Sequence, residues 1–249
     1  MAQIKADQLC GLMNSIYLAV DTTTEACSVA LCNGAESIFR YTEEPRMHAN
    51  LVLPMVDQLL AEAECQLNQL KGIIFCRGPG AFTGLRIGAG VVQGLAFSAD
   101  IPVMGVSTLA TIAQRAYREH GARRVYAAID ARMGEVYWGA YLLDEKLSSS
   151  AMQLEGEELV VRPQQLSIAA SSNKDWVGCG TGWNFANELA VAGVEVDVVY
   201  SGMLPHALDA LTLGIPGLSA GKGVAPELAI PQYLRNNVAK KKAEQGPAS

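Results

Sequence analysis

Two aspartates, Asp21 and Asp130, each end an apolar run that is followed by a short polar turn and a second apolar run. The two segments read AVD-TTTEA-CSVAL and AID-ARMGE-VYWGAYL. Carboxylates at such turns hold a metal–phosphate complex in some clefts, and in other turns they only accept hydrogen bonds from their own backbone. A single turn of this kind favours the second role, whereas the repetition favours a nucleotide-type architecture with two similar halves.

The second chemical feature is the glycine-rich stretch RGPGAFTGLRIGAGVVQGLAFS at residues 77–98, which predicts a loop followed by a helix. Its helical glycines are Gly84, Gly88, Gly90 and Gly94. Each costs about 0.5–1 kcal/mol relative to alanine. Helical glycines are kept at this cost for one of two reasons: the backbone at the helix start faces an anion, or another helix packs closely against the glycines. No Lys-Ser/Thr pair follows the last loop glycine, and the spacing misses the dinucleotide fingerprint by one residue, so helix packing is favoured.

Other patterns point away from independent hydrolysis. Residues 217–221 match GxSxG, but a helix-like run precedes them and no strand–turn–helix context is expected there. The histidines His48, His120 and His206 are isolated, without HxxxH or HExxH spacing. The six cysteines form no CxxC pair and are interpreted as reduced core residues.

Composition limits the class of protein. The chain has 249 residues, of which 50% are hydrophobic, and a net charge of −6. Free nucleic acid is therefore not expected to be the only partner of this acidic chain, because phosphate binding needs a basic surface. No apolar run reaches the length of a membrane helix and the N-terminus lacks an apolar signal core, so a cytoplasmic protein without membrane contact is expected.

The elements that would position these residues follow from periodicity and turn signals. The Asn33-Gly34 turn predicts a hairpin, and Pro54 predicts a kink in the first helix or its start near Leu51. Residues 148–158 are predicted to form an exposed loop. Strands are predicted at 16–21, 27–32, 36–42, 70–77, 101–107, on both sides of the turn in 123–144, and at the start of 175–184; helices are predicted at 48–65, within 77–98, at 108–122 and from about 205.

These elements suggest two similar subdomains. Residues 15–107 are predicted to form the first, with a C-terminal helix at about 205–235 packing on it, and residues 108–204 the second. Residues 1–14 and 240–249 are predicted to be flexible extensions.

Six segments together resemble the TsaB family of tRNA threonylcarbamoyladenosine biosynthesis proteins, also called YeaZ. They are LAVDTTTEACSVAL, RGPGAFTGLRIG, GVSTLATIAQ, AAIDARMGEVYWGAY, GTGW and YLRNNVA, between Ile16 and Ala239. The resemblance implies an α/β fold of the actin-like ATPase (ribonuclease H-like) type, with two subdomains that each carry a mixed sheet flanked by helices. It also implies a role in placing threonylcarbamoyl on adenosine 37 of ANN-decoding tRNA.

The resemblance further implies a non-catalytic subunit. In that family the catalytic paralogue TsaD binds metal through a histidine pair on its first long helix, whereas this chain has His48 and then Val52. ATP and metal would belong to the partner subunits, and this subunit would require no cofactor. TsaD would form a heterodimer with it, TsaE would join a ternary complex, and tRNA would be met only through that complex. An apolar interface without its partner would pair with itself, so the chain alone is expected to form a homodimer.

Carried onto this sequence, the resemblance gives two sets of site residues. The partner interface would lie on the first two helices, with His48 interpreted as solvated; its residues would be Met47, His48, Leu51, Met55, Leu59, Thr83, Gly84, Arg86, Ile87, Gly88 and Val91. A vestigial nucleotide cleft would be lined by Asp21, Thr22, Thr23, Asp130, Arg132, Gly180 and Gly182. The alternative function is an autonomous actin-like ATPase or phosphotransferase, in which Asp21 and Asp130 organise magnesium and phosphates.

Overall fold

The computed structural model describes residues 15–34, 36–145, 150–167 and 175–235. The two predicted extensions, 1–14 and 240–249, lie outside the described residues. Within the described part, no helix is both long and apolar enough to cross a membrane.

The first sheet consists of five strands in the order β3-β2-β1-β4-β5. β1 pairs antiparallel with β2, β2 antiparallel with β3, and β1, β4 and β5 run parallel. The hairpin predicted at Asn33-Gly34 is confirmed as the connection between β2 and β3. The strand bounds are Ile16–Asp21 (β1), Cys27–Asn33 (β2), Glu36–Thr42 (β3), Leu70–Gly78 (β4) and Val103–Ser107 (β5).

The second sheet repeats this topology strand for strand, in the order β8-β7-β6-β9-β10. Its first three strands pair antiparallel, and β6, β9 and β10 run parallel. The repeat predicted around Asp21 and Asp130 therefore corresponds to two equivalent central strands, β1 and β6. The bounds are Arg124–Arg132 (β6), Glu135–Asp144 (β7), Ala151–Val161 (β8), Val177–Cys179 (β9) and Val198–Tyr200 (β10).

Helices cover both faces of the first sheet. α1 (His48–Glu62) and α2 (Phe82–Ala99) pack on one face, where Val56, Leu59 and Val92 are fully buried. α5 (Ala207–Ser219) packs on the other face through Leu211 and Ile215. Because β1 is buried on both sides, its apolar residues do not alternate with polar ones.

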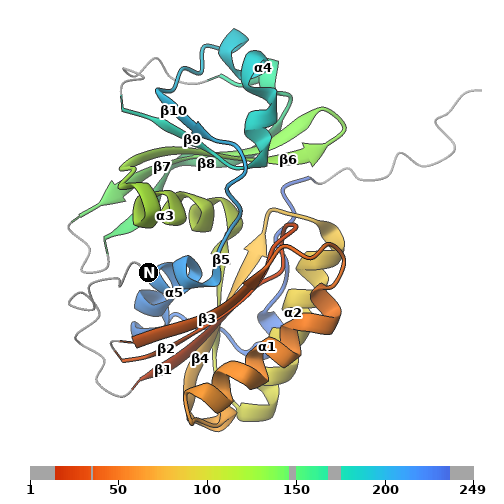
Figure 1. Ribbon diagram of the computed structural model, residues 1–249, viewed down its shortest axis with the longest axis vertical. Helices are drawn as coiled ribbons and strands as arrows, with labels where there is room; N and C mark the ends of the chain where they lie inside the picture. The colour runs from red at the N-terminus through yellow and green to blue at the C-terminus, as the bar shows by residue number, and fades with distance from the viewer. Residues whose placement is uncertain (1–14, 35, 146–149, 168–174, 236–249) are drawn as a thin grey trace, which may run out of the picture.

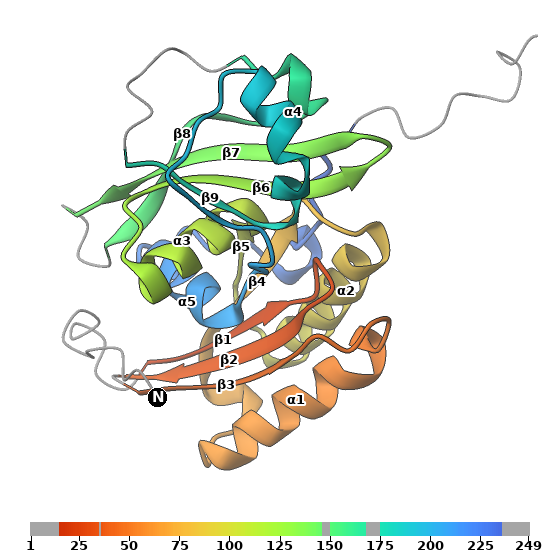
Figure 2. The same ribbon diagram turned by 45° about the horizontal axis from the view of Figure 1, so that its top comes forward.

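The helices between the two sheets are α3 (Thr108–His120) and α5, which contact each other (Figure 1 and Figure 2). α3 follows β5 of the first sheet but packs on the second sheet. α5 follows β10 of the second sheet but packs on the first. The outer face of the second sheet is covered by α4 (Ala186–Val191), by the short helices η3 (Pro163–Gln165) and η4 (Thr181–Phe185), and by a cluster that includes three tryptophans.

Several local predictions are corrected. The loop predicted at 148–158 is largely strand β8, whose many exposed residues face solvent at the sheet edge. The helix predicted at about 205–235 ends at Ser219, and the chain continues through the short helix η5 (Pro226–Leu228) in a largely extended path. α1 begins at His48, as its predicted range has it, and runs through Pro54, so the alternative start near Leu51 is wrong. The strand expected within 175–184 is confined to β9, and another short helix, η2 (Leu67–Gln69), precedes β4.

Candidate functional site

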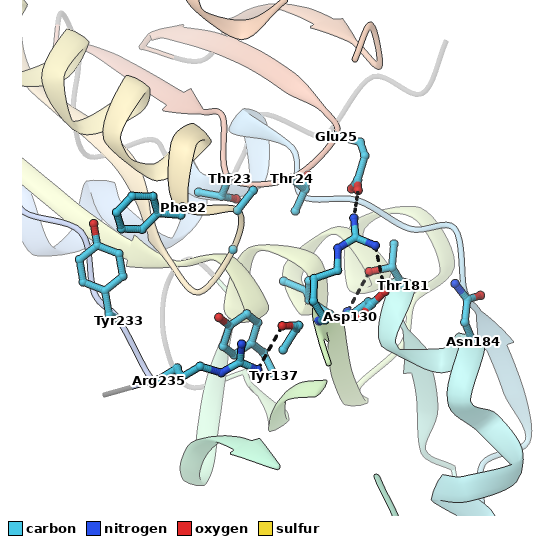
Figure 3. A pocket seen from close by; sticks show the side chains of 15 residues that line it. Thr23, Thr24, Glu25, Phe82, Asp130, Tyr137, Thr181, Asn184, Tyr233 and Arg235 are labelled. Carbon is cyan, nitrogen blue, oxygen red and sulfur yellow. Dashed lines mark hydrogen bonds and ion pairs between the residues drawn. The ribbon is translucent and has the colours of Figure 1, made fainter. Parts of the chain in front are cut away.

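A cleft of about 540 Å³ lies between the two halves, where the β1–β2 and β6–β7 turns approach each other (Figure 3). The first half contributes the β1–β2 turn and the loop before α2. The second half contributes β6, β7 and η4, and the C-terminal segment completes the wall. The lining residues are 23–25, 80–82, 129–132, 137, 181, 184, 233 and 235. Of the predicted cleft residues, Thr23, Asp130 and Arg132 line this space, whereas Asp21, Thr22, Gly180 and Gly182 are not among its lining residues.

The Asp21 carboxylate is completely buried beneath the β1–β2 turn. Its Oδ1 accepts hydrogen bonds from the Thr23 backbone N–H at 3.2 Å and from the Thr23 hydroxyl at 2.7 Å. Its Oδ2 has no hydrogen-bond partner among the described residues. Burial raises the pKa of this carboxyl, and the hydrogen bonds from Thr23 lower it by less. Asp21 is therefore a turn residue of the interior and not a ligand that faces the cleft.

Asp130, at the equivalent position of β6, does face the cleft. Its Oδ1 accepts a 2.7 Å hydrogen bond from the Arg132 backbone N–H, and its Oδ2 lies 3.3 Å from the Arg132 guanidinium. The same guanidinium lies 3.7 Å from Glu25, which comes from the opposite half (Figure 3). Arg132 thus joins two carboxylates across the cleft, although its exposure of 77% leaves these pairs screened by water.

Two glycines behind the second-half wall of the cleft permit close backbone contacts. A β-carbon at Gly180 would lie 2.2 Å from the Ala128 carbonyl oxygen, and one at Gly182 would lie 2.7 Å from the Ala128 β-carbon. These glycines support the end of β6, while Thr181 between them lines the cleft and accepts a hydrogen bond from the Asp130 backbone N–H at 3.1 Å.

The C-terminal segment contributes cleft residues that the sequence reasoning did not identify. Arg235 donates to the Ala131 carbonyl at 3.1 Å and forms an ion pair with Glu135. Tyr233 packs against Phe82 with ring centroids 5.7 Å apart. From sequence, the segment YLRNNVA indicates only the family resemblance, because nothing local in it predicts a return to the β6–β7 turn.

The cleft residues do not fit a magnesium nucleotide. Asp21 is sealed below the surface, and Asp130 and Glu25 are both engaged by Arg132. Glu25 also places a negative charge where phosphates would approach, and the described residues that line the cleft include no lysine. Within the described ranges, no three His, Cys, Asp or Glu side chains are grouped so that they could hold a metal ion.

The predicted interface residues divide into two groups. Met55, Leu59, Gly84 and Gly88 are buried within their own chain, so their assignment to a partner surface is corrected. A β-carbon at Gly84 would lie 2.0 Å from the Thr22 carbonyl oxygen, and one at Gly88 would lie 2.6 Å from the Thr22 hydroxyl. The Thr22 hydroxyl in turn donates to the Gly84 carbonyl at 2.7 Å. These two glycines bring α2 against the β1–β2 turn.

His48 is also corrected, because it is buried and not solvated. Its Nε2 lies 3.0 Å from the Thr24 carbonyl oxygen and 3.2 Å from that of Ala26. The first turn of α1 is therefore tied to the β1–β2 turn.

The remaining predicted interface residues stay accessible on the outer face of α1 and α2. Met47, Thr83 and Arg86 are exposed, and Leu51, Ile87 and Val91 are half-buried. Sequence reasoning missed Leu53, Phe82 and Phe97, which are 44%, 55% and 78% exposed. Phe97 lies on the same helical row as Gly90 and Gly94, so extending that row by one turn would have found it.

Comparisons with known proteins agree with this geometry. The family model described as TsaD, tRNA N6-adenosine threonylcarbamoyltransferase, matches residues 42–243. A crystal structure titled YeaZ from Pseudomonas aeruginosa superposes with a TM-score of 0.82 at 48% identity, covering 88% of this chain and all of that one. The repeated topology and these matches define an α/β protein of the actin-like, ribonuclease H-like class.

Relatives from two bacterial species narrow the assignment. The tRNA threonylcarbamoyladenosine biosynthesis protein TsaB of Escherichia coli is 46% identical over 90% of this chain and 96% of its own length. The protein of the same name from Haemophilus influenzae is 39% identical over 93% of this chain and 98% of its own length. The chain belongs to the TsaB family.

Proposed function

We propose that this chain is a non-catalytic subunit that pairs with a TsaD-type paralogue for N6-threonylcarbamoylation of adenosine 37 in ANN-decoding tRNA. The names of the relatives and of the matching family model support the pathway. In this proposal TsaE joins the pair, tRNA is met through the complex, and ATP and metal are held by the partner subunits. The poor fit of the cleft to a magnesium nucleotide supports the absence of independent ATP chemistry.

The observation that carries the proposal is the outer face of α2. In this 18-residue helix, Arg86 is the only charged side chain, although the helix is exposed along one side. A β-carbon at Gly90 or Gly94 would meet no atom within 4 Å, so these glycines leave the exposed side bare. Depletion of charge at the centre of a surface is typical of protein interfaces, and a bare glycine face permits close approach of another backbone.

The test is binding of the TsaD-type subunit to surface variants, measured by sedimentation velocity. Gly94→Glu and Gly90→Glu place a charge at the centre of the face, and each is expected to raise the Kd at least tenfold. Ala190→Glu, on the exposed side of α4, is the matched control and should bind normally. Normal binding by both glycine variants, with the fold intact by circular dichroism, would contradict the proposed face.

A second readout addresses the alternative of an autonomous ATPase. The purified chain is expected to release phosphate from ATP no faster than buffer alone, with or without magnesium. Turnover that is lost in Asp130→Asn would overturn the non-catalytic role. The same face is proposed to pair two copies when the partner is absent, so Gly94→Glu should also shift the isolated chain towards monomer.

A further inference from the structure

The C-terminal strap, residues 224–235, runs beside α2 along the outer layer of the first half (Figure 1). Val224 forms an antiparallel bridge with Val103, and the Gln93 side chain donates to the Ala229 carbonyl at 3.2 Å. The Gln232 backbone N–H donates to the Arg77 carbonyl at 2.7 Å. Arg235 then reaches the second half through Glu135. The strap is thus fixed along its length and offers a defined surface.

The strap presents apolar side chains to solvent on either side of a buried anchor. Ala229 is 1% exposed and belongs to the core beneath α1 and α2, whereas Leu228 and Ile230 are 58% and 63% exposed. Phe97 comes one helical turn after Gln93, the residue that holds Ala229, so it projects on the same side of α2. The exposed strip of Phe97, Leu228 and Ile230 borders the bare face of Gly90 and Gly94.

The area of the α1–α2 face indicates that a partner needs this strip. At 1.5 Å per residue and about 10 Å of width, α1 and α2 present together about 500 Å². A standard stable interface buries about 800 Å² on each partner. The eight residues Pro226–Tyr233, largely extended at about 3.3 Å per residue, add about 250 Å² beside α2. The three elements together approach the required area, which two helices do not.

The distribution of charge on this surface also fits a protein–protein interface. Phe97, Leu228 and Ile230 carry no charge, and Glu227 adjoins them in sequence. Arg86 lies further along the strap, where its guanidinium packs over Phe82 and donates to the Tyr233 hydroxyl. An apolar centre with a charged rim is the usual anatomy of a protein–protein interface.

From the contiguity, area and charge of this surface, we propose that the strap is the third element of the surface that receives the TsaD-type subunit, with Leu228, Ile230 and Phe97 as its apolar anchors. This inference rests on the proposed pairing through the α1–α2 face. The occupant is the helical face of the paralogous subunit, whose backbone approaches Gly90 and Gly94 while its apolar side chains cover the strip.

The experiment measures the Kd of the full-length chain for the TsaD-type subunit in Leu228→Glu and Ile230→Glu variants. Each is expected to raise the Kd about tenfold or more, and Ile230→Ala to raise it by less. Val191→Glu is the matched control, because Val191 is an apolar side chain on α4 of the other half that is even more exposed (80%), and this variant should bind normally. Thermal unfolding midpoints should be unchanged in all variants, since these side chains point to solvent.

The outcomes separate this inference from the proposed function. If Gly94→Glu abolishes pairing while Leu228→Glu and Ile230→Glu bind within twofold of the unmodified chain, the strap is not part of the surface and the α1–α2 pairing stands. If none of the three affects pairing, both proposals fail. If the strap variants weaken only self-association of the isolated chain, the strap serves a second copy and the assignment to the paralogue is wrong.

Discussion

His206 shows how a single ionisable residue is kept neutral by its surroundings. The imidazole is 5% exposed, stacks on Tyr41 at 5.1 Å and meets Phe39 edge-on at 4.8 Å. Its Nδ1 accepts a 3.1 Å hydrogen bond from the Leu208 backbone N–H and so caps α5, a role that requires the unprotonated nitrogen. Burial, with the nearby Arg118 and Arg115 guanidinium groups, lowers the pKa of His206 to about 3.

This lowered pKa predicts that acid destabilises the fold through His206. Below pH 6.5 the unfolded chain binds a proton that the folded chain does not, so the free energy of unfolding falls as pH falls towards the folded pKa. The slope is at most about 1.4 kcal/mol per pH unit, or about 2 kcal/mol between pH 6.5 and pH 5. His206→Asn keeps a capping acceptor without the titration. Urea unfolding of both proteins from pH 7.5 to 5 should show the smaller loss in the variant, and parallel curves would contradict the prediction.

At the scale of the element, α2 carries glycines of two kinds. Gly84 faces the β1–β2 turn, where a β-carbon would lie 2.0 Å from a backbone oxygen, whereas Gly90 and Gly94 face open space. The helical pattern places the glycines in α2 without telling which of them face the interior. That distinction depends on Thr22, which is distant in sequence.

Alanine substitutions therefore have opposite effects along this one helix. Gly90→Ala and Gly94→Ala should each stabilise the protein by about 0.5–1 kcal/mol, because alanine has the higher helix propensity and meets no atom there. Gly84→Ala should destabilise it by about 1–3 kcal/mol, because the backbone must move. Chemical denaturation of the three variants under conditions where the chain is monomeric gives the comparison. Equal effects at all three positions would show that propensity alone governs α2.

α3 and α5 are joined by a buried ion pair. Arg118 donates from Nε and Nη2 to the two Asp209 oxygens at 2.9 and 2.8 Å, and Asp209 is 1% exposed. Burial raises the pKa of Asp209 to about 6, although Arg118 opposes the shift. The geometry of two parallel hydrogen bonds keeps the pair ionised at neutral pH.

Removing the arginine alone should leave a buried carboxylate without its counterion. Arg118→Ala is expected to cost about 3–5 kcal/mol of unfolding free energy at pH 7.5. The pKa of about 6 is reached while Arg118 lowers it, so the pKa of Asp209 lies higher in the variant. The folded variant therefore takes up the proton first, and the loss should shrink as pH falls from 7.5 towards 6. Arg118→Ala combined with Asp209→Asn should regain most of the stability. A double variant as unstable as Arg118→Ala at every pH would place the loss in packing and not in charge.

At the scale of the whole molecule, the strands and turns of the two halves can be predicted from the sequence wherever the pattern lies within one short segment. The apolar strands around Asp21 and Asp130 and the turns after them share one pattern, and both became central strands. The sequence of β8 predicts a loop because an edge strand such as EGEEL carries charges on its exposed positions, as a loop does. The return of Arg235 to the β6–β7 turn was not predictable, since it depends on contacts between residues far apart in sequence.

The crossed positions of α3 and α5 have a consequence for synthesis. The first five strands and their two outer helices are complete by Ser107, yet the inner face of that sheet is covered by a helix that begins at Ala207. On the ribosome, the apolar face that α5 later covers therefore stays exposed while about a hundred further residues are made. This face includes Tyr17, Ile74 and Cys76. The nascent N-terminal half therefore cannot bury this apolar face until α5 has left the ribosome.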